Sequence, residues 1–243
     1  MKISLIGKIL DLLQPRTCAI CGNKLMGSEE MICCSCLLDQ PWIHFWDQPY
    51  DNEMAQLFWH LIPIERCCAL YHHLSHTSSA HPIYQLKYCH NKEMGIYLGE
   101  MLASKGLETN FFEGVDAIVP IPLAPKREKE RGYNQSLVIA QGISRLTHLP
   151  IIKDAVSRTI FQESQTHKNR TERLANVEHA FHLNTQYQDP EGRHPISQLA
   201  GKHLLLVDDV CTTGATIISC AQELKKAGKM QFSVLTVGFA HDS

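Results

Sequence analysis

Two adjacent carboxylates, Asp208 and Asp209, follow an apolar run and precede a threonine-rich turn in the sequence LLLVDDVCTTGAT at 204–216. A buried parallel strand that ends here would bring both carboxylates to the edge where open α/β sheets bind ligands. Backbone N–H groups and hydroxyls of the turn, together with a helix N-terminus, suit a dianionic phosphate. The carboxylates can accept hydrogen bonds from ribose hydroxyls or lie near Mg²⁺. A plain helix cap, which needs only one such residue, is the alternative interpretation.

Four cysteines form two C-x-x-C pairs near the N-terminus, Cys18 with Cys21 and Cys33 with Cys36, with eleven residues between the pairs. Zinc binds four thiolates in a tetrahedron that leaves no open position, and two such pairs can supply them. A redox dithiol is the competing interpretation of C-x-x-C, but two pairs in succession favour a metal. The sequence therefore predicts a structural zinc ion on these four cysteines, with Cys34 as an adjacent free thiol.

Basic residues gather in two segments, one after the apolar stretch 115–123 and one in the polar stretch 157–176. Their guanidinium and ammonium groups can pair with a leaving diphosphate, or follow a nucleic-acid backbone as a pliant arm. A solvated charged turn and a plain exposed loop are the alternatives, since Glu128 and Glu130 nearly cancel the first segment's charge. The predicted diphosphate- or DNA-binding residues are Lys126, Arg127, Arg131, Arg158, Lys168, Arg170 and Arg173.

The bulk composition describes an ordinary globular protein. With 243 residues, 44% hydrophobic and 20% charged, the chain suits one full domain plus a small accessory module. With a formal net charge of -2, the molecule as a whole does not attract nucleic acid or anionic membranes. Any polyanion would therefore have to bind a local patch of basic residues. Without a cleavable signal peptide, and with metal-type cysteine spacing, the expected compartment is the reducing cytoplasm.

Apolar strands alternate with helical patterns after residue 65, which predicts a parallel α/β sheet flanked by helices. Helical spacing covers 84–107, 134–149 and 215–227, and strands are expected at 115–123, 204–210 and 232–239. The polar stretch 184–201 is expected to be a surface insertion. The first 13 residues suit an amphipathic helix, packed on the body or lying on a membrane surface, and too short to span a bilayer. The predicted domains are 1–64, with this helix and the zinc-binding module, and 65–243.

The run LLLVDDVCTTGAT resembles the signature of type I phosphoribosyltransferases, which bind 5-phosphoribosyl-1-diphosphate (PRPP) together with Mg²⁺. The resemblance implies their α/β fold for 65–243, with Asp208 and Asp209 on the ribose hydroxyls and 211–216 around the 5'-phosphate. The ribose- and phosphate-binding residues implied in this way are Asp208, Asp209, Cys211, Thr212, Thr213, Gly214, Ala215 and Thr216.

Several motifs together resemble the ComF family of bacterial proteins. They are the two C-x-x-C pairs, LKY at 86–88, IVPIPL at 118–123, RGYNQS at 131–136, SRT at 157–159, RLAN at 173–176 and VDDVCTTGAT at 207–216. That family joins a small zinc module to a phosphoribosyltransferase-like domain and is associated with natural competence and the use of DNA as a nutrient. The resemblance implies single-stranded DNA and other DNA-uptake proteins at the inner membrane as partners.

Two functions follow from this resemblance. In the first, the protein handles imported single-stranded DNA in the cytoplasm through its basic segments, and the PRPP site acts as a ligand sensor or is a relic. In the second, it is an active phosphoribosyltransferase that transfers phosphoribose to a nucleobase or amine. No residue of the sequence stands out as a general base for the second function.

Overall fold

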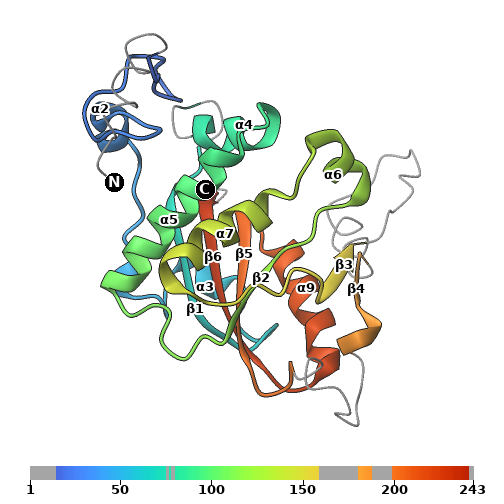
Figure 1. Ribbon diagram of the computed structural model, residues 1–243. Coiled ribbons are helices and arrows are strands. Elements are labelled where there is room, and N and C mark those ends of the chain that lie inside the picture. Colours follow the sequence, from blue (N-terminus) through green and yellow to red (C-terminus); the bar gives the residue numbers. More distant parts are fainter. Residues whose placement is uncertain (1–14, 75–76, 78–79, 159–179, 188–198, 241–243) are drawn as a thin grey trace, which may run out of the picture.

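A four-stranded parallel sheet forms the centre of the computed structural model, which describes residues 15–74, 77, 80–158, 180–187 and 199–240 (Figure 1). The strands, in spatial order, are β1 (Ile64–His72), β6 (Gln231–Phe239), β5 (His203–Cys211) and β2 (Ala117–Pro120). A parallel bridge between Ile118 and Ile151 adds a short contact at the β2 edge. The predicted parallel α/β sheet is confirmed.

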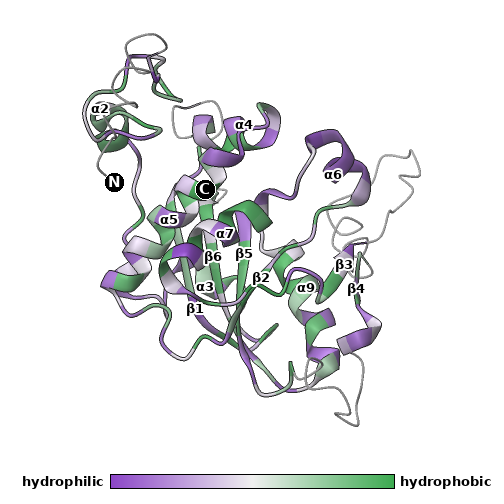
Figure 2. Ribbon diagram, in the orientation of Figure 1, coloured by the Kyte–Doolittle hydropathy of each residue, from purple (hydrophilic) through white to green (hydrophobic). Residues whose placement is uncertain are grey.

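The central strands are buried on both faces, as parallel strands between two layers of helices must be. In β5, Leu204 and Leu206 belong to one core cluster, while Leu205 and Val207 belong to the other. Figure 2 accordingly shows the strands of the sheet as mostly hydrophobic along their length. Every second side chain points to the opposite face, so the continuous apolar run LLLV fills both cores.

Helices α5 (Lys92–Glu108) and α7 (Gln135–Thr147) cover one face of the sheet (Figure 1). The other face is covered by α3 (Glu53–Gln56), α9 (Ala215–Leu224) and the hairpin formed by β3 (Val156–Arg158) and β4 (Phe181–Leu183). Helices α5 and α7 approach closely at Gly99 and Gly142, since a Cβ on Gly99 would lie 2.1 Å from the Ile139 carbonyl oxygen. This contact packs α7 closely against α5.

Three elements differ from the sequence-based expectation. The helical pattern over 84–107 is divided into α4 (His81–Tyr88) and α5, because His90 adopts a left-handed φ of 55° and the Asn91 side chain caps α5. The basic loop contains a short helix, α6 (Pro125–Arg131), which begins at a proline and ends at Gly132. The strand expected over 115–123 is confined to β2.

Some elements were not predicted from the sequence. These are β1, the β3–β4 hairpin, the short helix α3 and the 3-10 turns η1 (Phe45–Asp47), η3 (Thr185–Tyr187) and η4 (Lys225–Ala227). Strand β1 has consecutive buried residues without alternation, and the hairpin strands have only three residues each, so neither carries a period-2 pattern.

The four-cysteine segment forms a small module that ends in helix α2 (Cys34–Leu38) and packs against α5. The chain then runs beside β1, where Ile43 N donates to the Leu70 carbonyl at 3.0 Å. Phe58 and Ile62 enter the core shared with α9.

The domain boundary between residues 64 and 65 stays a prediction, and the expected N-terminal helix lies outside the described residues. Within the described ranges, no helix has both the length and the apolar character needed to cross a bilayer.

Candidate functional site

The turn after β5 lies at the carboxyl edge of the sheet and leads directly into α9. Gly214 begins this helix with φ 72°, a left-handed conformation that glycine adopts without strain. A Cβ on Gly214 would also lie 2.8 Å from Cε1 of the buried Phe58 ring. The turn encloses a small cavity of about 40 Å³, which is lined by Asp208 and by residues 210–217. Backbone amides and threonine hydroxyls around a cavity before a helix are the groups that bind phosphate.

Asp208 accepts two hydrogen bonds on Oδ1, from Ser136 Oγ at 2.9 Å and from the Asp209 amide at 2.9 Å. Burial raises the pKa of the Asp208 carboxyl to about 7, and the negative charge of Asp209 adds to this rise. The two hydrogen bonds and Lys87 act in the opposite direction. Asp208 therefore exchanges its proton near neutral pH, which makes it sensitive to a ligand that prefers one of its two forms.

Asp209 forms an ion pair with Lys87 of α4, with Nζ 3.1 Å from Oδ1. Both side chains are mostly shielded, with exposures of 22% for Lys87 and 14% for Asp209. His73, just beyond β1, has its Nδ1 buried without a hydrogen-bond partner among the described residues. Desolvation lowers the pKa of His73, Lys87 lowers it further and Asp209 opposes them. The edge thus carries two acids, a lysine and a histidine from three elements.

Helix α4 is tied to the segment between α6 and α7. The Tyr133 hydroxyl donates to the Leu86 carbonyl, and the Arg131 guanidinium lies 5.8 Å from the centre of the Tyr88 ring. Ser136, a few residues further on, bonds Asp208. The segments LKY, RGYNQS and VDD, which are far apart in sequence, therefore meet at one edge of the sheet.

The residues predicted to bind ribose and phosphate all lie in or beside this turn. Thr212 and Thr213 are exposed, while Ala215 and Thr216 are partly buried at the start of α9. The Cys211 side chain differs from the others because it is buried in the core, and this burial raises the pKa of its thiol to about 12. Cys211 can therefore contribute its backbone to the turn, but its side chain packs in the core.

The predicted diphosphate- or DNA-binding residues occupy different positions. Lys126 and Arg127 are exposed on α6, which Figure 2 shows as strongly hydrophilic, and Arg131 ends this helix. Arg158 of β3 is partly buried, with its guanidinium 5.1 Å from the centre of the Phe181 ring. Burial lowers the pKa of Arg158, as does the charge of Arg127, while the charge of Asp208 raises it, so Arg158 interacts electrostatically with Asp208. The predicted residues Lys168, Arg170 and Arg173 lie outside the described residues.

The four predicted metal ligands come together in the N-terminal module. The Sγ atoms of Cys18, Cys21, Cys33 and Cys36 all lie within 4.8 Å of one another. A zinc ion with four thiolates at about 2.3 Å sets the sulfur atoms about 3.8 Å apart, so the cluster fits a tetrahedral site. The Sγ atoms of Cys21 and Cys33 are 3.7 Å apart. Cys34 is exposed and lies outside this cluster, in agreement with the prediction.

Backbone amides in the module point at the cysteine sulfurs, as they do around structural zinc. Ile20 N donates to Cys18 Sγ at 3.4 Å and Cys33 N donates to the same atom at 3.3 Å. Desolvation disfavours the Cys18 thiolate, but these donors and the Cys21 amide outweigh it and lower the pKa of Cys18 to about 6. These backbone donors favour the thiolate form of Cys18, whereas the pKa values of the Cys33 and Cys36 thiols are raised.

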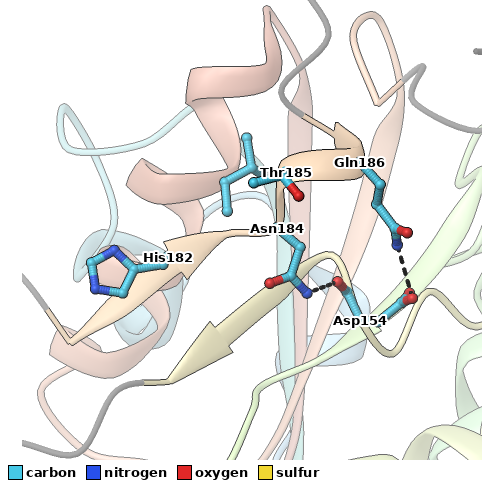
Figure 3. A pocket seen from close by; sticks show the side chains of 6 residues that line it. Asp154, His182, Asn184, Thr185 and Gln186 are labelled. Atoms are coloured by element: carbon cyan, nitrogen blue, oxygen red, sulfur yellow. Dashed lines mark hydrogen bonds between the residues drawn. The ribbon is translucent and has the colours of Figure 1, made fainter.

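A second pocket lies apart from both sites, at the end of the β3–β4 hairpin, and has a volume of about 580 Å³ (Figure 3). Both carboxylate oxygens of Asp154 are hydrogen-bonded there, to Gln186 Nε2 at 2.9 Å and to the Tyr187 hydroxyl at 3.1 Å. Asn184 donates to the Asp154 carbonyl, and His182 points away from this group. These contacts tie Asp154, which precedes β3, to the segment that follows β4.

Sequence reasoning missed three residues of the carboxyl edge: Lys87, Ser136 and His73. Lys87 and Ser136 lie within the LKY and RGYNQS segments that carried the family resemblance, and this was the available signal. His73 lies among other histidines in YHHLSH and carries no motif. The pairing of β1 with β6 brings His73 to the carboxyl edge, and this pairing is known only from the structure.

The parallel sheet flanked by helices has a phosphoribosyltransferase-like fold. The family model described as "Phosphoribosyl transferase domain" matches residues 133–241, which include β5, the turn, α9 and β6. A glutamine phosphoribosylpyrophosphate (PRPP) amidotransferase from B. subtilis, solved with ADP and GMP, aligns over 63% of this chain and 30% of that chain. With 16% identity and a TM-score of 0.37, this likeness is too weak to support the assignment.

Relatives among curated proteins carry names that agree with the family resemblance. The chain is 33% identical over 149 residues to "DNA utilization protein YhgH" of Escherichia coli (strain K12), covering 60% of each protein. It is 37% identical over 112 residues to "Competence protein ComFC" of Bacillus subtilis (strain 168), covering 46% of this chain and 39% of that protein. The matched region thus spans 60% or less of the length of either relative. The resemblance to the ComF family that the motifs indicate is confirmed.

Proposed function

We propose that this protein handles incoming single-stranded DNA in the cytoplasm, as a competence or DNA-utilisation factor, and binds PRPP with Mg²⁺ at the carboxyl edge of its sheet. The observation that carries the PRPP part is the pairing of Asp208 and Asp209 with the turn at 211–216, on one small cavity before a helix. Carboxylates suit ribose hydroxyls and Mg²⁺, and the helix N-terminus suits the 5'-phosphate.

The DNA part is supported by the names of the two relatives, which refer to DNA utilization and to competence. The two basic segments of the sequence supply side chains that can pair with phosphates. Those we assign to diphosphate or DNA are Lys126, Arg127, Arg131, Arg158, Lys168, Arg170 and Arg173. Other DNA-uptake proteins at the inner membrane are the partners we propose, and Zn²⁺ on the four cysteines is proposed as a structural ion.

Calorimetric titration with PRPP and Mg²⁺ tests the PRPP site. Replacing Asp208→Asn together with Asp209→Asn should abolish binding while circular dichroism shows an intact fold. The control is Asp51→Asn, which removes an exposed carboxylate on the loop before α3 and should bind like the unmodified protein. Binding retained by the double variant would contradict the proposed site.

Salt dependence tests the DNA contacts. Replacing Arg170 and Arg173 together with alanine should weaken binding to single-stranded DNA and lower the slope of log K against log salt by about two. An unchanged slope would reject the assignment of these two residues to phosphates.

An active phosphoribosyltransferase is the second candidate, favoured by the electrostatic interaction between Arg158 and Asp208. A half-buried guanidinium there could stabilise the negative charge of departing diphosphate. Incubation with labelled PRPP, Mg²⁺ and a panel of bases would reveal this activity through released diphosphate. Release that depends on both a base and Asp208 would establish turnover, and its absence with every base would leave ligand binding as the function of the site.

A further inference from the structure

Two tyrosines lie one helical turn apart on the outer side of α4. Tyr84 is 56% exposed and Tyr88 is 60% exposed. Their rings lie 5.0 Å apart, with an interplanar angle of 43°. Two large aromatic side chains left open side by side form a patch of the kind that marks a binding surface.

Cations border this aromatic pair. The Arg131 guanidinium lies 5.8 Å from the centre of the Tyr88 ring. Lys92, at the start of α5, lies 5.3 Å from the centre of the Tyr133 ring, whose hydroxyl is bonded to α4. Helix α6 adds three further basic residues and two acidic ones, Glu128 and Glu130, so its charge including Arg131 is positive. Exposed aromatic rings combined with cations are what single-stranded nucleic acid requires, because the rings stack with bases and the cations pair with the backbone.

We propose that Tyr84 and Tyr88 form a base-stacking platform for single-stranded DNA, and that Arg131 and Lys92 pair with the flanking phosphates. This inference rests on the proposed function in DNA handling and gives it a location in the fold. Bases in a duplex are already stacked on one another, so the platform selects unpaired strands.

The platform and the sugar-phosphate site share α4. Lys87, the residue before Tyr88, reaches Asp209 at 3.1 Å, while the two tyrosine rings remain exposed to solvent. The bond from the Tyr133 hydroxyl to the Leu86 carbonyl holds this helix in place. DNA on the platform would therefore lie at the mouth of the sugar-phosphate site.

Fluorescence anisotropy with a labelled oligo-dT strand tests the platform. Replacing Tyr84 and Tyr88 together with alanine should raise the Kd by about tenfold or more. The slope of log K against log salt should stay unchanged, since stacking releases no counterions. Replacing Arg131 with alanine should instead lower this slope by about one.

The chain offers a matched control at Tyr50, which is 58% exposed and also lies beside an arginine, Arg66, at 5.6 Å. Tyr50 precedes β1, away from the carboxyl edge, so Tyr50→Ala should leave DNA affinity unchanged. Tyr84→Phe with Tyr88→Phe keeps both rings and should retain most of the affinity. An abasic strand should bind the unmodified protein and the double alanine variant equally weakly, because it has nothing to stack.

Crosslinking makes the test independent of any variant. A strand containing 5-bromodeoxyuridine, irradiated with the unmodified protein, should label a peptide that spans α4. A label found only elsewhere, or a double alanine variant that binds as tightly as the unmodified protein, overturns the platform while leaving DNA handling intact. If the unmodified protein fails to bind single strands, the proposed DNA function falls together with the platform.

Discussion

The four-cysteine module and the carboxyl edge of the sheet are built from groups at very different separations along the chain. Cys18 and Cys33, which meet in the module, are 15 positions apart. Ser136 and Asp208, which meet at the edge, are 72 positions apart. The module therefore needs only a short loop to close, whereas the edge exists only after the whole sheet has formed.

This difference indicates that the two sites depend on different sources of stability. A small module with few buried side chains is expected to depend on a bound metal for its stability. The edge is held by strands that are buried on both faces and by the close approach of α5 and α7. A substitution that disrupts one site is therefore expected to leave the structure of the other site intact.

The largest effect is expected from a zinc ligand. Replacing Cys18 with serine should abolish zinc binding and unfold residues 16–38, because structural zinc contributes about 10–16 kcal/mol at pH 7. PRPP affinity should remain unchanged, since no described residue of the module contacts the carboxyl edge. Zinc content by mass spectrometry and hydrogen exchange measured separately over 16–38 and 204–216 would show both effects.

Cys34 provides the control, because it is exposed and adjacent to a ligand but outside the cluster. Cys34→Ser should keep about one zinc ion per chain. Loss of protection at 204–216 in Cys18→Ser would show that the sheet depends on the module, and the proposed separation would then be wrong.

A smaller effect is expected from the turn. Replacing Gly214 with alanine forces a side chain into a left-handed backbone and brings its Cβ to 2.8 Å from the Phe58 ring. Gly114 has the same φ of 72° but no neighbour closer than 4.0 Å, so Gly114→Ala isolates the backbone strain. Chemical denaturation should show Gly214→Ala to be the less stable variant by about 1–3 kcal/mol. Only Gly214→Ala should lose PRPP affinity, while both should keep zinc; equal effects of the two substitutions would refute the close fit.

The next effect is a pH dependence. Because the pKa of Asp208 is about 7, ligands that need the ionised carboxylate should bind about tenfold more tightly at about pH 8 than at about pH 6. Ser136→Ala removes a hydrogen bond that favours the ionised form, so the midpoint of the profile should move to higher pH. The phosphates of PRPP titrate in the same way with the unmodified protein and with Ser136→Ala, so a difference between the two pH profiles must come from the protein. If the two calorimetric profiles coincide, Asp208 does not control binding.

The same pKa gives a stability prediction with a defined sign. Since the folded-state pKa of Asp208 lies above its ordinary value of 3.8, the native state holds an extra proton between about pH 4 and pH 7. The contribution of Asp208 to the free energy of unfolding should therefore decrease as pH rises through this window. Asp208→Asn should flatten this part of the profile in denaturation experiments.

Local sequence was sufficient to predict the cysteine cluster and the turn after β5, because the residues of each lie close together along the chain. The strands β5 and β6 were also predictable, since their apolar runs are long and continuous. The hairpin strands were not, because three residues carry no period, and α6 was missed because charged residues suit both a loop and a short exposed helix. His73 and Lys87 reach the edge only through the order of the strands and the break between α4 and α5.

Loss of the Lys87 side chain is expected to have the smallest effect on PRPP affinity. Its ion pair with Asp209 is largely shielded, whereas the Lys105 pair with Glu108 has the same 3.1 Å distance but exposures of 52% and 60%. Lys87→Met leaves the two acids without this cation and should weaken PRPP binding by about threefold to tenfold, and Lys87→Arg should restore much of the loss. Lys105→Met should change neither ligand affinity nor stability by more than about 1 kcal/mol. Tighter binding by Lys87→Met would mean that the lysine competes with Mg²⁺ for Asp209. Its role would then be to neutralise Asp209 when no ligand is bound.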